Sequence, residues 1–130
     1  MASVRGSTAR RRPTLRSLKV SDGFKSFVLD QLEELGDVTP RSMFGGVGLY
    51  HRGVFFGIIA RDTLYLKVGS SNLADYERAA MKPFRPYPNR SGKMRYYSVP
   101  LDVLENAPEL ATWARKAIAV ASGRATPSEG

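Results

Sequence analysis

His51 is the only histidine of the chain, and it is the first side chain to consider for catalysis. A hydrolytic triad needs a base that lies beside a nucleophile and an orienting group. The spacing predicts His51 in a hairpin turn directly before Arg52, whose positive charge would make the imidazole a poor base. One histidine without nearby acids does not form a zinc site, and the chain has no cysteine to act as nucleophile or ligand. We therefore expect His51 to be a solvated turn residue.

Carboxylates can act as acid and base or hold Mg²⁺, but in this sequence they are scattered. Glu33 and Glu34 are predicted on the solvated face of one helix, Asp75 and Glu77 on that of another, and Asp62 at a turn. No pair of acids follows a predicted strand end beside a second pair. We therefore expect no enzymatic activity, no metal, no cofactor and no small-molecule substrate. An enzyme or a small-ligand binder that uses a face of the predicted sheet and Arg41 is a minor alternative.

The segment Gly45-Gly46-Val47-Gly48 invites comparison with phosphate-binding loops. The GxGxxG pattern is broken, because His51 occupies the position of its third glycine, and no Lys-Ser or Lys-Thr pair follows. No helix is predicted directly after the glycines, so a helix N-terminus would not face a bound phosphate. Glycines within a strand more often mark a bulge or a close approach, so we expect Gly45, Gly46 and Gly48 to admit a helix or another backbone.

The net charge is distributed unevenly along the chain. The 130 residues contain 20 Lys and Arg against 12 Asp and Glu, a formal charge of +8. The first 19 residues contain no acid and six basic residues, which are Arg5, Arg10, Arg11, Arg12, Arg16 and Lys19. Such a stretch cannot bury enough apolar surface to fold, so residues 1–19 are predicted to be a disordered tail. Residues 20–123 are predicted to form one nearly neutral domain, followed by a short tail over 124–130.

The basic tail has two main interpretations. It could bind the phosphates of DNA without reading its sequence, or it could be a solubilising leader. Its composition also suits a mitochondrial transit peptide, whereas binding to anionic lipid would lack an apolar anchor. The longest apolar run, residues 53–60, is far shorter than the roughly 20 residues that a membrane helix needs, so no membrane span is expected.

Helix signals occur at both ends of the predicted domain and in its middle. Ser21 is a good N-cap for a first helix with an apolar stripe, and Gly36 stands where such a helix ends. Pro108 opens a last helix that Gly123 ends. A middle helix follows an N-cap segment over 70–72, with inward residues Leu73, Tyr76 and Ala80, and a helical turn is predicted over 101–106.

Between the predicted helices, the spacing of apolar residues changes from the helical period to the alternation that is typical of strands. Strands are predicted over 43–50, 54–60, 63–68 and 93–99, and the gaps between the first three have hairpin length. The order of elements predicts an α+β fold, in which an antiparallel sheet of about four to five strands with a meander core packs against an N-terminal, a middle and a C-terminal helix.

Aromatic and basic residues alternate on the predicted strands. Together they could form one face of the sheet, made of Tyr50, Phe55, Tyr65, Lys67, Arg95 and Tyr97. Aromatic rings between cations can stack on nucleic acid bases. Aromatic residues in strands more often pack against helices or a partner subunit, and we favour that interpretation.

Several motifs occur in the order found in one family. They are Arg41-Ser-Met-Phe-Gly-Gly-Val-Gly-Leu-Tyr50, Gly53-Val-Phe-Phe-Gly57, Leu64-Tyr-Leu-Lys67, Tyr96-Tyr-Ser-Val-Pro100 and Leu110-Ala-Thr-Trp-Ala-Arg-Lys-Ala117. The sequence over about 22–122 resembles the N-terminal domain of TfoX/Sxy, the bacterial competence regulators. The resemblance implies an α/β domain with an antiparallel sheet, a bacterial cytoplasmic protein, and regulation of DNA uptake or transcription through protein partners. Longer family members carry a second, helical domain, so roles that need that domain are not expected of this sequence.

The motif residues can also be assigned physical roles. Met43, Phe44 and Trp113 are large and apolar, so we expect them in the core. Arg41 follows Pro40 at a strand entrance, where it could cap the first helix or face a ligand, and we favour a structural role. The expected function is that of a regulatory or adaptor domain that binds a protein partner or a second copy of itself through sheet aromatics. The alternative is weakly specific DNA binding through the tail.

Overall fold

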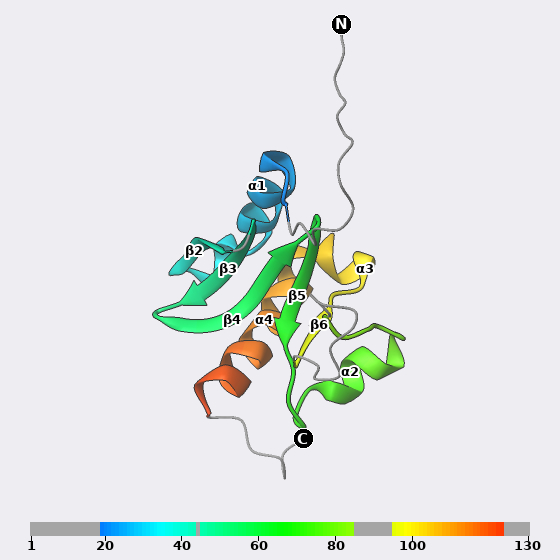
Figure 1. The fold of residues 1–130 in the computed structure, drawn as a ribbon. Coiled ribbons are helices and arrows are strands. Elements are labelled where there is room, and N and C mark those ends of the chain that lie inside the picture. The colour runs from blue at the N-terminus through cyan, green and yellow to red at the C-terminus, as the bar shows by residue number, and fades with distance from the viewer. Residues whose placement is uncertain (1–18, 44, 85–94, 124–130) are drawn as a thin grey trace, which may run out of the picture.

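The computed structural model describes residues 19–43, 45–84 and 95–123. The predicted tails over 1–18 and 124–130 lie outside these residues. Five strands form one antiparallel sheet in the order β2-β3-β4-β5-β6, so each strand pairs with its neighbours in sequence (Figure 1). They are β2 (Val38–Met43), β3 (Gly46–His51), β4 (Val54–Ala60), β5 (Thr63–Lys67) and β6 (Tyr96–Ser98). The predicted α+β meander is confirmed.

Helices cover one face of this sheet. α4 (Ala107–Ser122) runs across β4 and β5, and α1 (Asp22–Gln31), the 3₁₀ helix η1 (Glu33–Leu35) and α3 (Leu101–Leu104) pack against α4 (Figure 1). The residues that fill the space between α4 and the sheet are fully or nearly fully buried and include Leu49, Phe56, Ile59, Leu64, Leu66, Leu110, Ala114, Ala117 and Ile118. The alanines of α4 allow the helix axis to approach the sheet closely.

The predicted helix ends are partly confirmed. The Ser21 hydroxyl accepts a hydrogen bond from the Phe24 N–H at the start of α1, and the Asn106 side chain caps α4 in the same way. Gly123 ends α4 in the left-handed region with φ 81°. The first helix is shorter than the sequence predicted, because α1 ends at Gln31 and a 3₁₀ turn continues to Gly36. Phe27, expected on the inward stripe, is 38% exposed.

Strand β2 was not predicted. The first predicted strand began at Met43, whereas the chain forms a strand over Val38–Met43 and then turns into β3. Pro40 made this segment a poor strand candidate because proline has no N–H to donate. β2 lies at the edge of the sheet, where one side of the strand has no partner within the described residues, so a proline is tolerated there.

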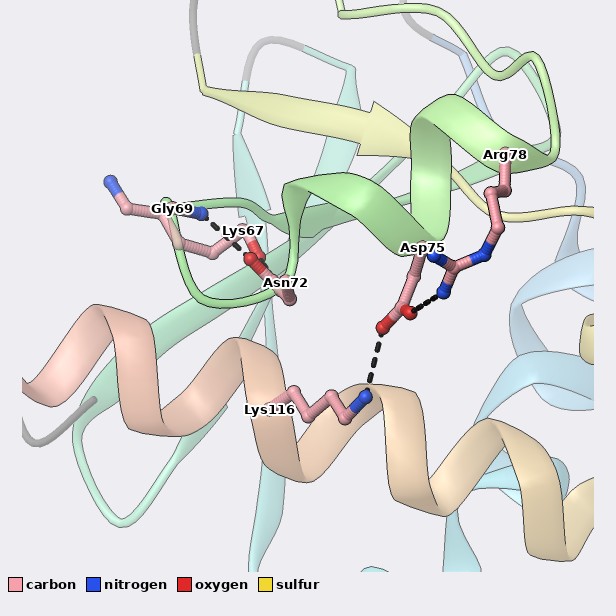
Figure 2. Close-up of polar contacts among 6 residues, drawn as sticks. All are labelled: Lys67, Gly69, Asn72, Asp75, Arg78 and Lys116. Carbon is pink, nitrogen blue, oxygen red and sulfur yellow. Dashed lines mark hydrogen bonds and ion pairs between the residues drawn. The ribbon is translucent and has the colours of Figure 1, made fainter. Parts of the chain in front are cut away.

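The middle helix α2 (Leu73–Arg78) is held by polar contacts on both sides (Figure 2). Asn72 occupies the N-cap position of α2, as predicted, but its side chain makes no capping hydrogen bond. Its side chain instead accepts a hydrogen bond from the Gly69 N–H at 2.8 Å and donates one to the Lys67 carbonyl at 3.1 Å, which fixes the connection from β5. Asp75, predicted on a solvated face, accepts from Arg78 and from Lys116 of α4, each at 2.9 Å. The ion pair with Lys116 ties α2 to α4.

Candidate interaction face

The sheet has a second apolar layer on the face opposite α4. Successive side chains of a strand point to opposite faces, so Tyr96 points away from the main core while Tyr97 packs against it. The second layer is a small buried cluster of Ile58, Ala60, Phe84 and Tyr96, with Phe55 and Tyr65 packed against it. This layer is the setting of the predicted aromatic and basic face.

One residue from each of the five strands contributes to a continuous row on this face. The row, called the aromatic row below, consists of Arg41, Tyr50, Phe55, Lys67 and Tyr96. The Tyr50 and Phe55 rings stack with centroids 5.0 Å apart, and the Phe55 and Tyr96 centroids are 5.4 Å apart. The Arg41 guanidinium lies 5.4 Å from the centroid of the Tyr50 ring, and the Lys67 ammonium lies 5.1 Å from that of Tyr96. The row therefore joins three rings and two cations.

Strand register explains why these residues meet. Tyr50 lies directly opposite Phe55, and Lys67 directly opposite Tyr96. A bulge between Leu49 and Tyr50 shifts the pairing of β3 with β4 by one residue. The shift lets Phe55 face the aromatic row although Gly57, two residues later, faces the main core beside Leu66 and Leu49.

Gly48 lies beneath the row, where a larger residue would crowd three side chains. A Cβ at this position would lie 2.8 Å from Met43 Cε, 3.1 Å from the Phe55 ring and 3.3 Å from the Tyr50 ring. The space that the glycine leaves is filled by these side chains, not by the helix or backbone that the sequence analysis expected. Met43 is half-buried on this face and is absent from the main core cluster, so its predicted core position is wrong.

A shallow hollow lies at the β2 end of the row. It has a volume of about 260 Å³ and is lined by Thr39, Arg41, Tyr50 and Gly53. Its lining offers a guanidinium, two hydroxyls and a ring. Arg41, which was expected in a structural role, is exposed here, and its described contact is with the Tyr50 ring. Such a lining suits a carboxylate or another small anion carried on a larger molecule.

The charge of the row comes from its two cations. Burial, and secondarily the nearby Tyr50 hydroxyl, raises the pKa of Tyr96 to about 12, so that this phenol is neutral at physiological pH. None of the five strands contains Asp or Glu. The acids of the described residues lie in helices, beside helix ends or in the loops between elements. The strands therefore contribute positive charge and no negative charge to this face.

The remaining residues of the predicted face fall in different places. Tyr65 lies on the same side and packs on Phe84 with ring centroids 4.7 Å apart. Tyr97 was placed on the wrong face, because its ring contacts Tyr76 in the main core at 5.9 Å. Trp113 also packs on Tyr76, with ring centroids 4.7 Å apart, and borders the main core as expected.

The glycine motif is only partly described. Gly46 is buried within β3, and Gly45 adopts φ 85° in the turn that precedes it. This turn requires the left-handed conformation that glycine adopts without strain. Phe44 lies outside the described residues, as do all basic residues of the tail except Lys19, which is exposed.

Among the described residues, His51 forms no ion pair with a carboxylate. His51 is half-buried at the end of β3, and the neighbouring Arg52 forms an ion pair of 2.8 Å with Asp37. Within residues 19–43, 45–84 and 95–123, no group of three or more His, Asp or Glu side chains could hold a metal ion. In the same part of the chain, no helix is both long enough and apolar enough to cross a membrane.

Sequence reasoning missed Tyr96 and Thr39 as residues of this face. Tyr96-Tyr97 gave no sign of which ring faces the core, since both positions suit a strand equally. Thr39 was overlooked because β2 itself was not predicted. The alternation of Leu64, Leu66 and Val68 places these side chains on the core face and Lys67 on the opposite face. Because Tyr96 pairs with Lys67, its ring lies on the same face as Lys67, but this pairing is known only from the structure.

Comparison with known proteins identifies the family of this fold. Residues 30–121 match the TfoX N-terminal domain. A search of curated proteins found no match to the chain. The matched range runs from the end of α1 to the last turn of α4 and so includes the whole sheet and the aromatic row. The chain therefore belongs to the TfoX N-terminal domain family.

Proposed function

We propose that this domain is a non-enzymatic regulatory or adaptor module that binds a protein partner through the aromatic row, in competence or transcription regulation. Membership of the TfoX N-terminal domain family supports a competence-regulator-like role. The observation that carries the proposal is the row itself, in which every strand of the sheet contributes one side chain to the face opposite α4. Aromatic and arginine side chains are the residues enriched at protein interfaces.

Affinity capture from the native host tests the proposal. Tyr50→Ala removes the ring at the Arg41 end of the row, and Phe27→Ala removes an exposed ring on α1 as a matched control. Retained protein is identified by mass spectrometry, and sedimentation velocity reports self-association of each purified variant. The proposal expects the wild type and Phe27→Ala to retain the same partner or dimer, and Tyr50→Ala to lose it while remaining folded. Equal retention by all three proteins would refute it.

DNA binding through the basic tail is the second candidate. The concentration of six basic residues and no acid in residues 1–19 favours it. About five phosphate contacts would lower affinity by more than two decades between 50 and 200 mM salt. Deletion of residues 1–19 is expected to abolish binding of a duplex oligonucleotide in an anisotropy titration, and unchanged affinity would exclude the tail as the binding element.

A further inference from the structure

We infer that the partner of the aromatic row is an acidic protein segment, which places one carboxylate beside Arg41 in the hollow and another beside Lys67. The inference rests on the proposed function, since it names the chemistry of the partner for the same face. It goes beyond that function because it assigns the recognition to two particular cations.

Arg41 and Lys67 have no acidic partner within the described part of the chain. Among the other described cations, Arg52, Arg78, Arg115 and Lys116 lie within 4 Å of a carboxylate oxygen, whereas no such ion pair includes Lys25, Arg61, Lys82 or Arg95. The cations of the row instead rest on rings, Arg41 on Tyr50 and Lys67 on Tyr96. A cation held over a ring keeps outward N–H groups that can donate to a carboxylate.

This face of the sheet is also complementary in charge to an acidic segment. The strands contain no acid, so an incoming carboxylate meets no like charge from the sheet on this face. Arg41 comes from the edge strand β2 and Lys67 from β5, so the two cations are separated by β3 and β4 with Tyr50 and Phe55 between them. Such a surface suits a segment that alternates carboxylates with apolar side chains.

The arrangement of the rings favours a protein over a nucleic acid. Base stacking needs a ring with a free face. Phe55 stacks on Tyr50 with an angle of 28° between the ring planes, and the Arg41 guanidinium lies over the Tyr50 ring. Tyr96 is 96% buried, since only 4% of its surface is exposed. The rings therefore supply edges and small exposed areas, which suit side-chain packing better than an inserted base.

The test is a titration of the full-length ¹⁵N-labelled protein, followed through backbone amide shifts. The probes are a blocked peptide Glu-Ala-Glu-Tyr-Glu-Ala-Glu, the same peptide with Gln in place of every Glu, and a single-stranded thymidine oligonucleotide. Variants are Arg41→Gln and Lys67→Gln, with Arg61→Gln in the exposed β4–β5 turn as the control of equal charge change. Shifts of the amides over 5–19 are scored separately, because the basic tail attracts anions independently of this face.

The inference expects the acidic peptide to shift the amides of Thr39, Arg41, Tyr50, Gly53 and Lys67. Arg41→Gln and Lys67→Gln are each expected to weaken that binding about fivefold, while Arg61→Gln leaves it unchanged. Equal binding of the Gln peptide, stronger binding of the oligonucleotide at these amides, or shifts confined to α4 would each overturn the inference. Those results would leave the proposed function standing if Tyr50→Ala still lost the partner in the host capture experiment, so the two failures are distinguishable.

Discussion

Ala80 lies just beyond the C-terminal end of α2 and has a left-handed backbone conformation, which suits glycine. The Ala80 N–H donates to the Glu77 carbonyl at 3.0 Å, and the Met81 N–H donates to the Tyr76 carbonyl at 2.9 Å. These two bonds form a Schellman motif, whose left-handed position is Ala80 with φ 59°. Ala80 is exposed, so its methyl group contributes little to packing. We therefore expect Ala80→Gly to stabilise the domain.

The expected change in the free energy of unfolding is the difference between two opposing contributions. Left-handed backbone costs a residue with a Cβ about 1–2 kcal/mol, whereas glycine adds about 0.5–1 kcal/mol of backbone entropy to the unfolded state. The net gain in the free energy of unfolding is about 1 kcal/mol, which for a domain of this size raises Tm by about 4 °C. Urea unfolding followed by circular dichroism and by Trp113 fluorescence measures it, and coincident transitions would support a two-state analysis.

Ala79→Gly is the matched control for this change. Ala79 is also exposed, but its φ is −90°, so glycine brings the entropy cost without relief of strain. We expect the control to lower the free energy of unfolding by about 0.5–1 kcal/mol. If Ala80→Gly and Ala79→Gly lowered stability equally, Ala80 would not occupy the left-handed region and the assignment of the Schellman motif would be refuted.

Three further measurements address the second layer and the buried tyrosines. Gly48→Ala should lower the free energy of unfolding by about 1 kcal/mol, because its Cβ would crowd Met43 and Phe55; strict additivity in a double-mutant cycle with Met43→Ala would contradict that contact. Tyr76→Phe should raise Tm, since the buried Tyr76 hydroxyl has no hydrogen-bond partner among the described residues and its removal is worth about 1 kcal/mol; a lower Tm would reveal a partner. Burial raises the pKa of Tyr96 to about 12 and that of Tyr76 further, so both phenols stay protonated when unfolded tyrosines ionise near pH 10. The folded state then binds more protons than the unfolded state, and stability should fall from pH 10 to 12, less steeply in Tyr76→Phe; constant stability over that range would contradict the burial.

The sequence predicted the fold where local signals agreed with one another. Ser21 and Gly123 mark helix ends, and the short gaps between β3, β4 and β5 specify hairpins whatever the tertiary context. The failures occur where tertiary structure decides. Pro40 is compatible with a strand only because β2 lies at the sheet edge. Ala80 appeared to continue an apolar helical stripe, but the helix had already ended at Arg78.

The candidate face was predicted less completely for a different reason. Tyr50, Tyr65 and Lys67 were grouped correctly because alternation within β3 and β5 determines which side chains share a face. Phe55 was also grouped correctly, but it reaches this face through the bulge in the pairing of β3 with β4. The grouping failed at β6, where a shift of one residue exchanges Tyr96 with Tyr97. No local pattern distinguishes these two tyrosines. Only the pairing of Tyr96 with Lys67, fixed by tertiary packing, does so.

Net charge does not show the local charge distribution on which the proposed binding depends. Residues 20–130 carry a charge of only +2, which gives no reason to expect recognition of an anion. On the helical side, Arg78 and Lys116 form ion pairs with Asp75. The strands of the sheet contribute Arg41 and Lys67 and contain no acid. Specific recognition depends on such local complementarity, whereas long-range attraction depends on the total charge. A tail that attracts anions and a face that selects them would then act at different stages of binding, so that removing residues 1–19 should slow association and removing the Arg41 charge should speed dissociation.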